Sequence, residues 1–149
     1  MTVRVLVQRL HPRAILPARA RPGDAGWDLC ALEGGIVLPR ERSAVPTGLS
    51  IALPPGFVGL VHPRSGLALE HGVTVANAPG TIDAGYRGEI RVILVNLGET
   101  SWRFEPGARI AQLLVSRVEA PEWMEVDQLP GTQRGGGGFG STGSDSTIR

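Results

Sequence analysis

The sequence contains no lysine and a single cysteine, Cys30, among its 149 residues. One cysteine excludes an intrachain disulfide and gives no sign of an oxidising compartment. We therefore expect Cys30 to fill the core and the protein to be cytoplasmic. Because lysine is absent, any basic side chain that contacts a phosphate must be one of the fifteen arginines, whose planar guanidinium groups can bind two oxygens at once.

Long apolar runs and a strong net charge are also missing. No run approaches the ~20 apolar residues of a membrane span, and residues 1–10 alternate apolar and polar, unlike the apolar region of a signal peptide. The formal net charge of +1 provides no long-range attraction to nucleic acid or to a membrane surface. We expect neither as a partner.

Glycine and proline, by contrast, are abundant, with 21 and 12 residues. From Pro12 to Pro63 they recur at intervals too short for helices of normal length. Short apolar segments between them predict strands at residues 3–7, around Leu29 and Val37, and at 49–53, 57–61, 90–97 and 110–118. One short helix is predicted after His62, with Ser65 as its cap and Gly72 as its end. This pattern indicates an all-β fold, a jelly-roll-like β-sandwich or distorted barrel.

Two parts of the chain differ in composition. Residues 1–130 predict one β domain, whereas residues 131–149 form a glycine-rich arm with little apolar surface with which to fold by itself. Within the arm, Phe139 offers a stacking face, and Arg134 and Ser141 offer phosphate contacts. The composition fits a flexible arm that closes over a bound ligand.

A polar stretch, residues 77–90, lies between the apolar segments 73–75 and 90–97, which predict the two arms of a β-hairpin. A bend at Pro79-Gly80 then places Asp83 near the tip of the hairpin. Exposed backbone groups there can recognise a planar, hydrogen-bonding ligand such as a nucleobase, and the carboxylate can orient or deprotonate a water. The alternative is a simple connection whose aspartate caps a turn.

Two further segments carry acidic and basic groups. Asp24 and Asp28 flank Trp27, which suggests either a turn aspartate beside a core tryptophan or a carboxylate, Asp28, that faces a hydrated cation. Arg64 and Ser65 stand at the predicted helix start, where backbone N–H groups, a guanidinium and a hydroxyl make an anion site. A capped helix with a surface arginine explains the same residues.

Gln112 lies on a predicted strand among large apolar neighbours. A buried amide without partners would cost roughly 1–3 kcal/mol, so the side chain needs a partner. The partner can be another part of the chain or a bound ligand, and the sequence slightly favours the former.

Taken together, five segments occur in a specific order with strand-sized gaps between them. This order resembles the trimeric deoxyuridine triphosphate nucleotidohydrolase (dUTPase) family over residues 22–143. The segments are AGWDL at 25–29, PRSGLA at 63–68, NAPGTIDAGYRGEI at 77–90, GARIAQLL at 107–114 and RGGGGFGSTG at 134–143.

The resemblance implies Mg²⁺-dependent hydrolysis of dUTP to dUMP and pyrophosphate by water attack at the α-phosphorus. This activity limits uracil incorporation into DNA and supplies dUMP for dTMP synthesis. In the catalytic pair that the resemblance implies, Asp83 activates the water and Gln112 places the water and the α-phosphate. Asp28 reaches the metal through water, and the substrate triphosphate holds the metal otherwise. The family also implies a homotrimer with shared active sites, the C-terminal arm of each subunit closing over a neighbouring site.

The remaining roles also follow from the resemblance. Asn77 and the hairpin backbone read the uracil, Phe139 stacks on the base, and Tyr86 lies against the deoxyribose, where it leaves no space for a ribose 2′-hydroxyl. The substrate-binding residues carried over are Arg64, Ser65, Gly66, Asn77, Gly80, Thr81, Ile82, Tyr86, Arg91, Arg134, Phe139, Gly140 and Ser141.

Two alternatives to this function are a relative of the dCTP deaminase type and a catalytically silent module that binds a nucleotide or a protein. A deaminase needs a glutamate on the strand after the hairpin, at a position that aligns with Ile93, and Glu89 comes several residues too early. A silent module has no evident need of the carboxylate of Asp83.

Overall fold

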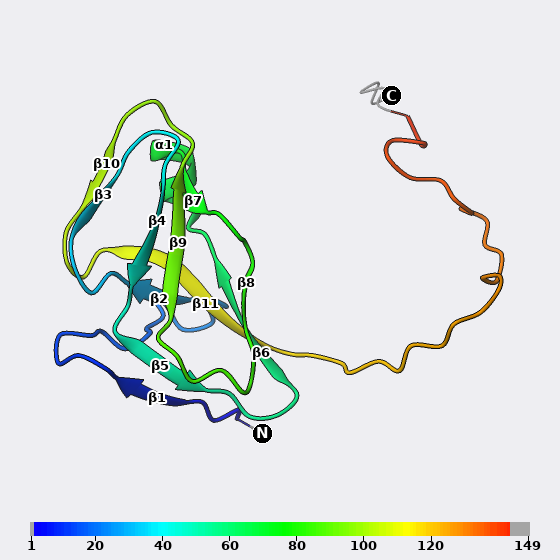
Figure 1. The fold of residues 1–149 in the computed structure, drawn as a ribbon, viewed down its shortest axis with the longest axis horizontal. Coiled ribbons are helices and arrows are strands. Elements are labelled where there is room, and N and C mark those ends of the chain that lie inside the picture. Colours follow the sequence, from blue (N-terminus) through cyan, green and yellow to red (C-terminus); the bar gives the residue numbers. More distant parts are fainter. Residues whose placement is uncertain (1, 144–149) are drawn as a thin grey trace.

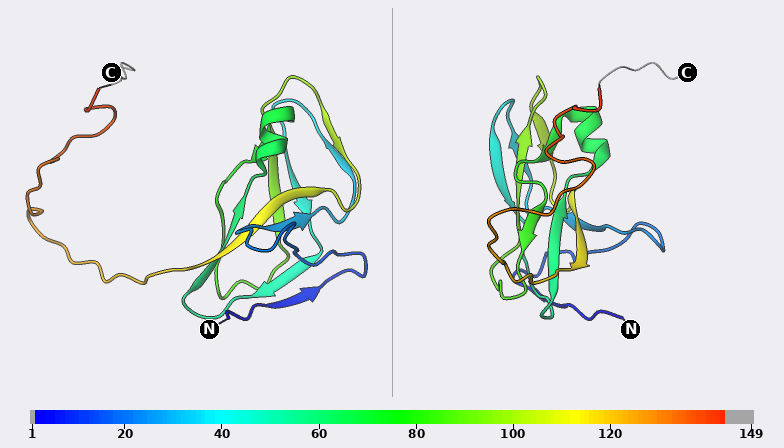
Figure 2. Two further views of the ribbon diagram at one scale, coloured as in Figure 1. Left: turned by 180° about the vertical axis from the view of Figure 1, so that it is seen from behind. Right: turned by 90° about the vertical axis from the view of Figure 1, so that its right-hand side faces the viewer.

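The computed structural model describes residues 2–143, which form a β body and an extended C-terminal segment (Figure 1). The predicted all-β, jelly-roll-like sandwich is confirmed. The last six residues of the predicted arm, 144–149, lie outside the described residues. Figure 2 shows the C-terminal segment leaving the body at the end of β11 and running away from it.

Short strands and one short helix make up the body in the described part of the chain. Their bounds are β1 Leu6–Arg9, β2 Trp27–Cys30, β3 Gly35–Val37, β4 Arg42–Pro46, β5 Leu49–Ala52, β6 Phe57–His62, α1 Ser65–His71, β7 Val73–Val75, β8 Gly80–Ile82, β9 Arg91–Asn96, β10 Trp102–Phe104 and β11 Arg109–Arg117.

These strands pair antiparallel in four small sheets. The largest has the order β2-β11-β6-β8, the second β4-β9-β7, and two further pairs are β1-β5 and β3-β10. The nine-residue strand β11 joins β2 on one side and β6 on the other. As a result β8 is an edge strand of the largest sheet, because only β6 pairs with it among the described residues.

The core lies between the sheets and is aliphatic. On β9 buried and exposed residues alternate, so Val92 and Leu94 point inward, as the period of a half-buried strand requires. Asn96 follows them into the interior, where its amide donates to the carbonyl oxygens of Val37 and Thr100, and its side-chain oxygen accepts the N–H of Gly98. A buried amide with all three partners carries no desolvation penalty of an unpaired group.

The predicted hairpin is confirmed in its arms and wrong at its tip. β7 pairs with β9, with Val75 opposite Leu94. Residues 80–82, however, form β8 and pair with β6. Burying Ile82 in the core pulls this segment across to the larger sheet, so Asp83 follows a strand end and does not stand at a tip.

The predicted helix is confirmed at its end and wrong at its cap. Gly72 adopts the left-handed conformation with φ 67°, and its N–H donates to the Ala68 carbonyl, which closes the last turn. The N-cap position is Arg64 and has no side-chain cap hydrogen bond, while Ser65 is already helical.

The strand predictions were less complete at the edges of the body. The first strand begins at Leu6, because pairing with β5 starts only at Leu6 opposite Ala52. β4 and β10 were not anticipated from the sequence. No helix among residues 2–143 is both long and apolar enough to cross a membrane.

Candidate active site

A pocket of about 200 Å³, which we call the Asp83 pocket, lies beside β8 and the loop that follows it. All its lining residues except Val61 come from residues 75–93. They are Val61, Val75, Asn77, Gly80, Thr81, Ile82, Asp83, Tyr86, Glu89, Ile90, Arg91, Val92 and Ile93. Of the predicted site residues, the structure therefore brings Asn77, Gly80, Thr81, Ile82, Asp83, Tyr86 and Arg91 together.

Strand β8 gives this pocket an unpaired backbone edge. An edge strand presents free N–H and C=O groups that can pair with a planar ligand as another strand would. Gly80 leaves room for such an approach, since a Cβ there would lie 3.3 Å from the Val61 Cβ and 3.5 Å from the Asn77 side-chain nitrogen. The Asn77 amide thus stands next to the free edge.

Asp83 begins the turn that follows β8 and is exposed. Its carbonyl accepts the N–H of Tyr86 at 3.0 Å, which closes the turn. No described side chain pairs with the Asp83 carboxylate, so both of its oxygens can accept a proton or a water. The turn fixes the backbone while the carboxylate stays available.

Tyr86 is folded back onto its own loop. Its hydroxyl donates to the Glu89 carbonyl at 2.9 Å, and the ring lies over Gly88, where an added Cβ would come within 2.6 Å of the ring carbon Cζ. A side chain at position 88 would clash with the ring, so Gly88 permits this conformation.

The loop is fastened to β5 and to the turn before it. Ser50 donates its hydroxyl to the Arg87 carbonyl at 2.6 Å, Gly48 donates its N–H to the Glu89 carboxylate at 3.0 Å, and the Thr47 hydroxyl donates to the Ile90 carbonyl at 2.6 Å. These contacts join residues about 40 positions apart and hold the wall of the Asp83 pocket against the body.

A second pocket of about 380 Å³, the Asp28 pocket, gathers the charged residues of the site. Three separate segments line it. Its residues are Ala20, Asp24, Ala25, Gly26, Asp28, Arg64, Ser65, Gly66, Arg109 and Gln112. The predicted phosphate-contacting residues Arg64, Ser65 and Gly66, the predicted metal-side carboxylate Asp28 and the predicted catalytic Gln112 therefore share one cavity.

Asp28 stands between two guanidinium groups. Arg64 Nε lies 3.6 Å from Oδ1, and Arg109 Nη1 lies 3.7 Å from Oδ2. Arg64 also donates from Nη1 to the Arg109 carbonyl at 3.1 Å. The Asp28 side chain is only 20% exposed, so these pairs are screened by water less than surface pairs are. Asp24, by contrast, accepts the N–H of Arg21 within a turn, as a turn aspartate does.

The Gln112 side chain is paired internally through its nitrogen and still faces the cavity. Its side-chain nitrogen donates to the Pro63 carbonyl at 3.0 Å. Its oxygen points toward Gly26, where an added Cβ would come 2.0 Å from that oxygen. Gly26 is therefore the residue that allows Gln112 to reach the pocket.

Arg109 and Gly26 were missed as site residues by the sequence reasoning. Both stood in segments that carry the family resemblance, GARIAQLL and AGWDL, and their place there was the available signal. On β11, Arg109 lies three residues before Gln112, and β11 pairs with β2, which carries Asp28.

Cys30, two residues from Asp28, is buried as expected. Burial raises the pKa of the Cys30 thiol, and the negative charge of Asp28 raises it further. The thiol thus stays protonated and is a poor nucleophile.

Two carboxylates line the Asp28 pocket: Asp28 stands beside the arginines, and Asp24 accepts a hydrogen bond within its own turn. No group of three histidine, cysteine, aspartate or glutamate side chains gathers among residues 2–143. Mg²⁺ prefers oxygen ligands, keeps several of its waters and is commonly held by one or two carboxylates together with substrate phosphates. A single carboxylate beside two arginines fits that mode of binding.

The predicted arm residues contact neither pocket of their own chain. Arg134 donates to the Gly137 carbonyl at 2.7 Å, and Phe139 is fully exposed. Gly140 and Ser141 lie in turns of the same extended segment. The structure does not bring these four residues together with the rest of the predicted site.

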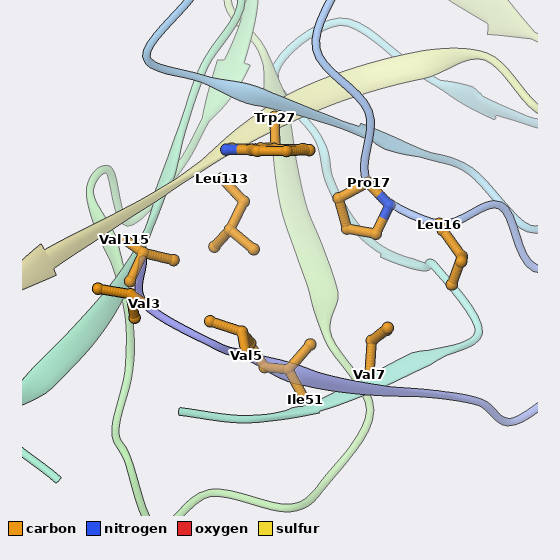
Figure 3. Close-up of a pocket in the computed structure, with 9 residues that line it drawn as sticks. All are labelled: Val3, Val5, Val7, Leu16, Pro17, Trp27, Ile51, Leu113 and Val115. Carbon is orange, nitrogen blue, oxygen red and sulfur yellow. The ribbon is translucent and has the colours of Figure 1, made fainter. Parts of the chain in front are cut away.

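A third cavity, of about 420 Å³, is an apolar groove between the N-terminal segment and β2 and β11. Figure 3 shows Trp27 above Leu113, facing Val5 across the groove. The groove is lined by Val3, Val5, Val7, Leu16, Pro17, Trp27, Ile51, Leu113 and Val115. Without charged or hydroxyl side chains it is unsuited to a triphosphate.

Comparisons with known proteins agree with this geometry. The dUTPase family model matches residues 12–143. A deoxyuridine 5′-triphosphate nucleotidohydrolase of Streptomyces griseus is 54% identical over 98% of this chain and 84% of its own length.

Solved structures are similar as well. A glycine-to-serine variant of the Staphylococcus bacteriophage 80alpha dUTPase with dUpNHpp has a TM-score of 0.89 and 29% identity over 95% of this chain and 99% of that one. A variant of the phage phi11 dUTPase of S. aureus, described with a structural Mg(II) ion, has a TM-score of 0.77 and 24% identity over 84% of this chain and 97% of that one.

Proposed function

The chain belongs to the dUTPase family, and from this premise we propose how its residues carry out the hydrolysis of dUTP to dUMP and pyrophosphate. The protein is a dUTP diphosphatase. The observation that carries the assignment of its site is the unpaired Asp83 carboxylate beside the free edge of β8 and the ring of Tyr86.

In the proposed site the uracil pairs with the backbone edge of β8 and with the Asn77 amide. Gly80, Thr81 and Ile82 form that edge, and Arg91 lines the same pocket. Tyr86 lies against the deoxyribose and excludes a 2′-hydroxyl. Its hydroxyl is engaged by the Glu89 carbonyl, so the ring presents a fixed apolar face to the sugar.

Asp83 is the proposed general base. Its carboxylate accepts a proton from the water that attacks the α-phosphorus, and the bond between the α-phosphorus and the bridging oxygen of the pyrophosphate breaks. A positioned base of this kind contributes about 10²–10⁴-fold in rate. No side chain forms a covalent intermediate in this scheme.

The Asp28 pocket is the proposed phosphate side. Arg64, Ser65 and Gly66 bind the phosphates, and Gln112 orients the water and the α-phosphate. Arg64 and Arg109 are both held by Asp28, so their guanidinium groups are positioned before the substrate arrives.

Mg²⁺ is the proposed cofactor, with Asp28 reaching it through water and the triphosphate supplying most ligands. When bound, the ion neutralises charge that develops on the phosphate oxygens. The carboxylate beside two arginines and the known preference of Mg²⁺ for oxygen ligands support this role.

We further propose a homotrimer in which residues 1–130 form the body and residues 131–149 form an arm that closes over a neighbouring site. Arg134, Phe139, Gly140 and Ser141 would then bind substrate in another subunit. Two observations support this. Arm residues touch neither pocket of their own chain, and residues 118–129 expose large apolar side chains, Trp123 at 91% and Met124 at 82%, which an assembly would bury.

The proposed location is the cytoplasm, where deoxynucleoside triphosphates serve DNA synthesis. The proposed partner is dUTP, with no role for nucleic acid or a membrane.

Incubation with dUTP, dCTP, dTTP or UTP plus Mg²⁺, followed by assays for pyrophosphate and ammonia, tests the function. We expect pyrophosphate to form from dUTP far faster than from the other three nucleotides. Ammonia from dCTP would instead indicate a deaminase, and no product from any nucleotide would indicate a silent binding module.

A further inference from the structure

We propose that Glu89 is a positioning residue that fixes the ring of Tyr86 and thereby sets the discrimination between dUTP and UTP. The inference rests on the proposed function, in which Tyr86 lies against the sugar. Glu89 acts through Tyr86 and needs no contact with the sugar itself.

The position of the Tyr86 ring depends on little except its hydroxyl. Tyr86 is 46% exposed, so packing alone restrains its side chain weakly. The hydroxyl donates to the Glu89 carbonyl at 2.9 Å, and Gly88 beneath the ring offers no side chain to support it. Moving the Glu89 carbonyl therefore moves the ring.

The residue that carries this carbonyl is anchored in turn through its side chain. The N–H of Gly48 donates to carboxylate Oε2 at 3.0 Å, a hydrogen bond strengthened by the negative charge. The next residue is fixed as well, because the N–H of Ile90 donates to the Leu49 carbonyl at 2.7 Å. With both anchors in place, the peptide between residues 89 and 90 cannot rotate freely.

Glu89 lines the Asp83 pocket but is poorly suited to act as a base. Oε2 is occupied by Gly48, and Oε1 lies 3.9 Å from the Arg91 guanidinium. The Glu89 side chain is 28% exposed, whereas the Asp83 carboxylate has no described partner. The two carboxylates of the pocket are thus equipped for different tasks.

The geometry separates two functions of the Glu89 side chain, the acceptor for Gly48 and the charge opposite Arg91. At 3.9 Å, with Arg91 57% exposed, the ion pair is weak. Glu89→Gln keeps an acceptor oxygen and loses the charge, whereas Glu89→Ala loses both. If the anchor matters, only the alanine variant should disturb Tyr86.

The first test compares kcat/KM for dUTP with kcat/KM for UTP in both variants. We expect Glu89→Ala to lower the ratio of kcat/KM for dUTP to kcat/KM for UTP about tenfold, which is the effect of losing one hydrogen bond. The change should come mainly from a higher KM for dUTP and a higher rate with UTP. Glu89→Gln should stay within about threefold of the unmodified protein. As a matched control, Glu99→Ala removes an exposed glutamate that pairs with Arg40 and should leave the ratio unchanged. An unchanged ratio in Glu89→Ala would overturn the proposal.

A second variant guards against misfolding of Glu89→Ala. Tyr86→Phe removes only the hydroxyl and should lower the ratio by a similar factor, with little further loss when it is combined with Glu89→Ala. Full retention of discrimination by Tyr86→Phe would contradict the role of the bond to the Glu89 carbonyl.

A direct readout of the ring is available because Tyr86 is the only tyrosine. Incorporated 3-fluorotyrosine gives one fluorine resonance, which we expect to move toward the unfolded-state shift in Glu89→Ala and to stay in place in Glu89→Gln. An identical resonance in both variants would refute the positioning role. If the unmodified protein fails to hydrolyse dUTP, the proposed function fails, yet the resonance still decides whether Glu89 fixes the ring.

Discussion

The Asp83 pocket is built almost entirely from one stretch of chain and held by hydrogen bonds to the backbone, whereas the Asp28 pocket is assembled from three segments whose charged side chains hold one another. The first is shaped by glycines, a turn and an edge strand. The second depends on Asp28 between Arg64 and Arg109. In the proposed assignment, the base and sugar side is therefore held by neutral backbone contacts and one carboxylate, while the phosphate side relies on ion pairs that salt can weaken.

The variant Asp83→Asn is the most direct test of the different roles proposed for the two pockets. If the Asp83 carboxylate acts only on the water, the variant should lose about 10³-fold or more in kcat, at the level of a lost general base. The Kd for a non-hydrolysable dUTP analogue should stay within about threefold.

Pyrophosphate release and calorimetric titration measure these two quantities. Glu105→Gln, which changes an exposed glutamate between β10 and β11, is the control and should behave like the unmodified protein. An equal loss of binding and turnover in Asp83→Asn would contradict a role as base and imply that the carboxylate holds the substrate.

The arm contacts neither pocket of its own chain. Removing it therefore tests whether catalysis also needs the arm residues of another subunit. Deletion of residues 134–149 should slow turnover about 100-fold, because the proposed lid over the base and phosphates is lost. The thermal unfolding midpoint should be unchanged, since residues 134–143 contribute nothing to the core. Unchanged kinetics would contradict the arm hypothesis.

The variant Gly26→Ala should disturb the Asp28 pocket, the proposed phosphate side, without changing the Asp83 pocket. A methyl group there would come 2.0 Å from the Gln112 oxygen and force that side chain out of the Asp28 pocket. We expect about a tenfold loss of kcat and a loss of about 1–3 kcal/mol in unfolding free energy.

The matched control for this variant is Gly131→Ala, where nothing lies within 4 Å of the added carbon. Denaturant unfolding and steady-state kinetics check both variants. If the two behaved alike, Gln112 would not depend on the open space at Gly26.

The smallest effect is expected at Cys30, the last residue of β2, two positions after Asp28. Because its thiol is buried and its pKa is raised by burial and by Asp28, native protein should resist alkylation at neutral pH. Labelling should become complete on unfolding, as mass spectrometry can show. Rapid labelling of active protein would mean that the Asp28 pocket opens widely in solution.

The sequence predicted the parts of the molecule whose signal is local. Strand β9 carries a clear alternation of apolar residues, Gly72 ends the helix as a left-handed cap, and Cys30 is buried. The ordered motifs also predicted most of the polar residues of the two pockets, though not Gly26 or Arg109. Each of these features depends on residues close together in the chain or on a recurrent pattern.

The sequence could not predict which residues are brought together only by tertiary packing. Residues 80–82 look like a bend because of Pro79 and Gly80, yet Ile82 finds a place in the core and makes them a strand. Similarly, Ser65 is a favourable cap residue, but the helix begins one residue earlier than that role requires. Arg109 escaped notice because its partner, Asp28, lies 81 positions away and meets it only when β2 pairs with β11.

The hydrogen bonds that join residues 87–90 to β5 and to the turn before it should also determine how long this region stays folded during denaturation. Amide protons at Gly48 and Ile90, both held in this seam, should exchange with solvent only when the whole body opens, and not in local fluctuations. Amides of residues 119–129, which belong to no described helix or strand, should exchange far sooner. The wall of the Asp83 pocket would then be among the last parts of the molecule to be lost during denaturation.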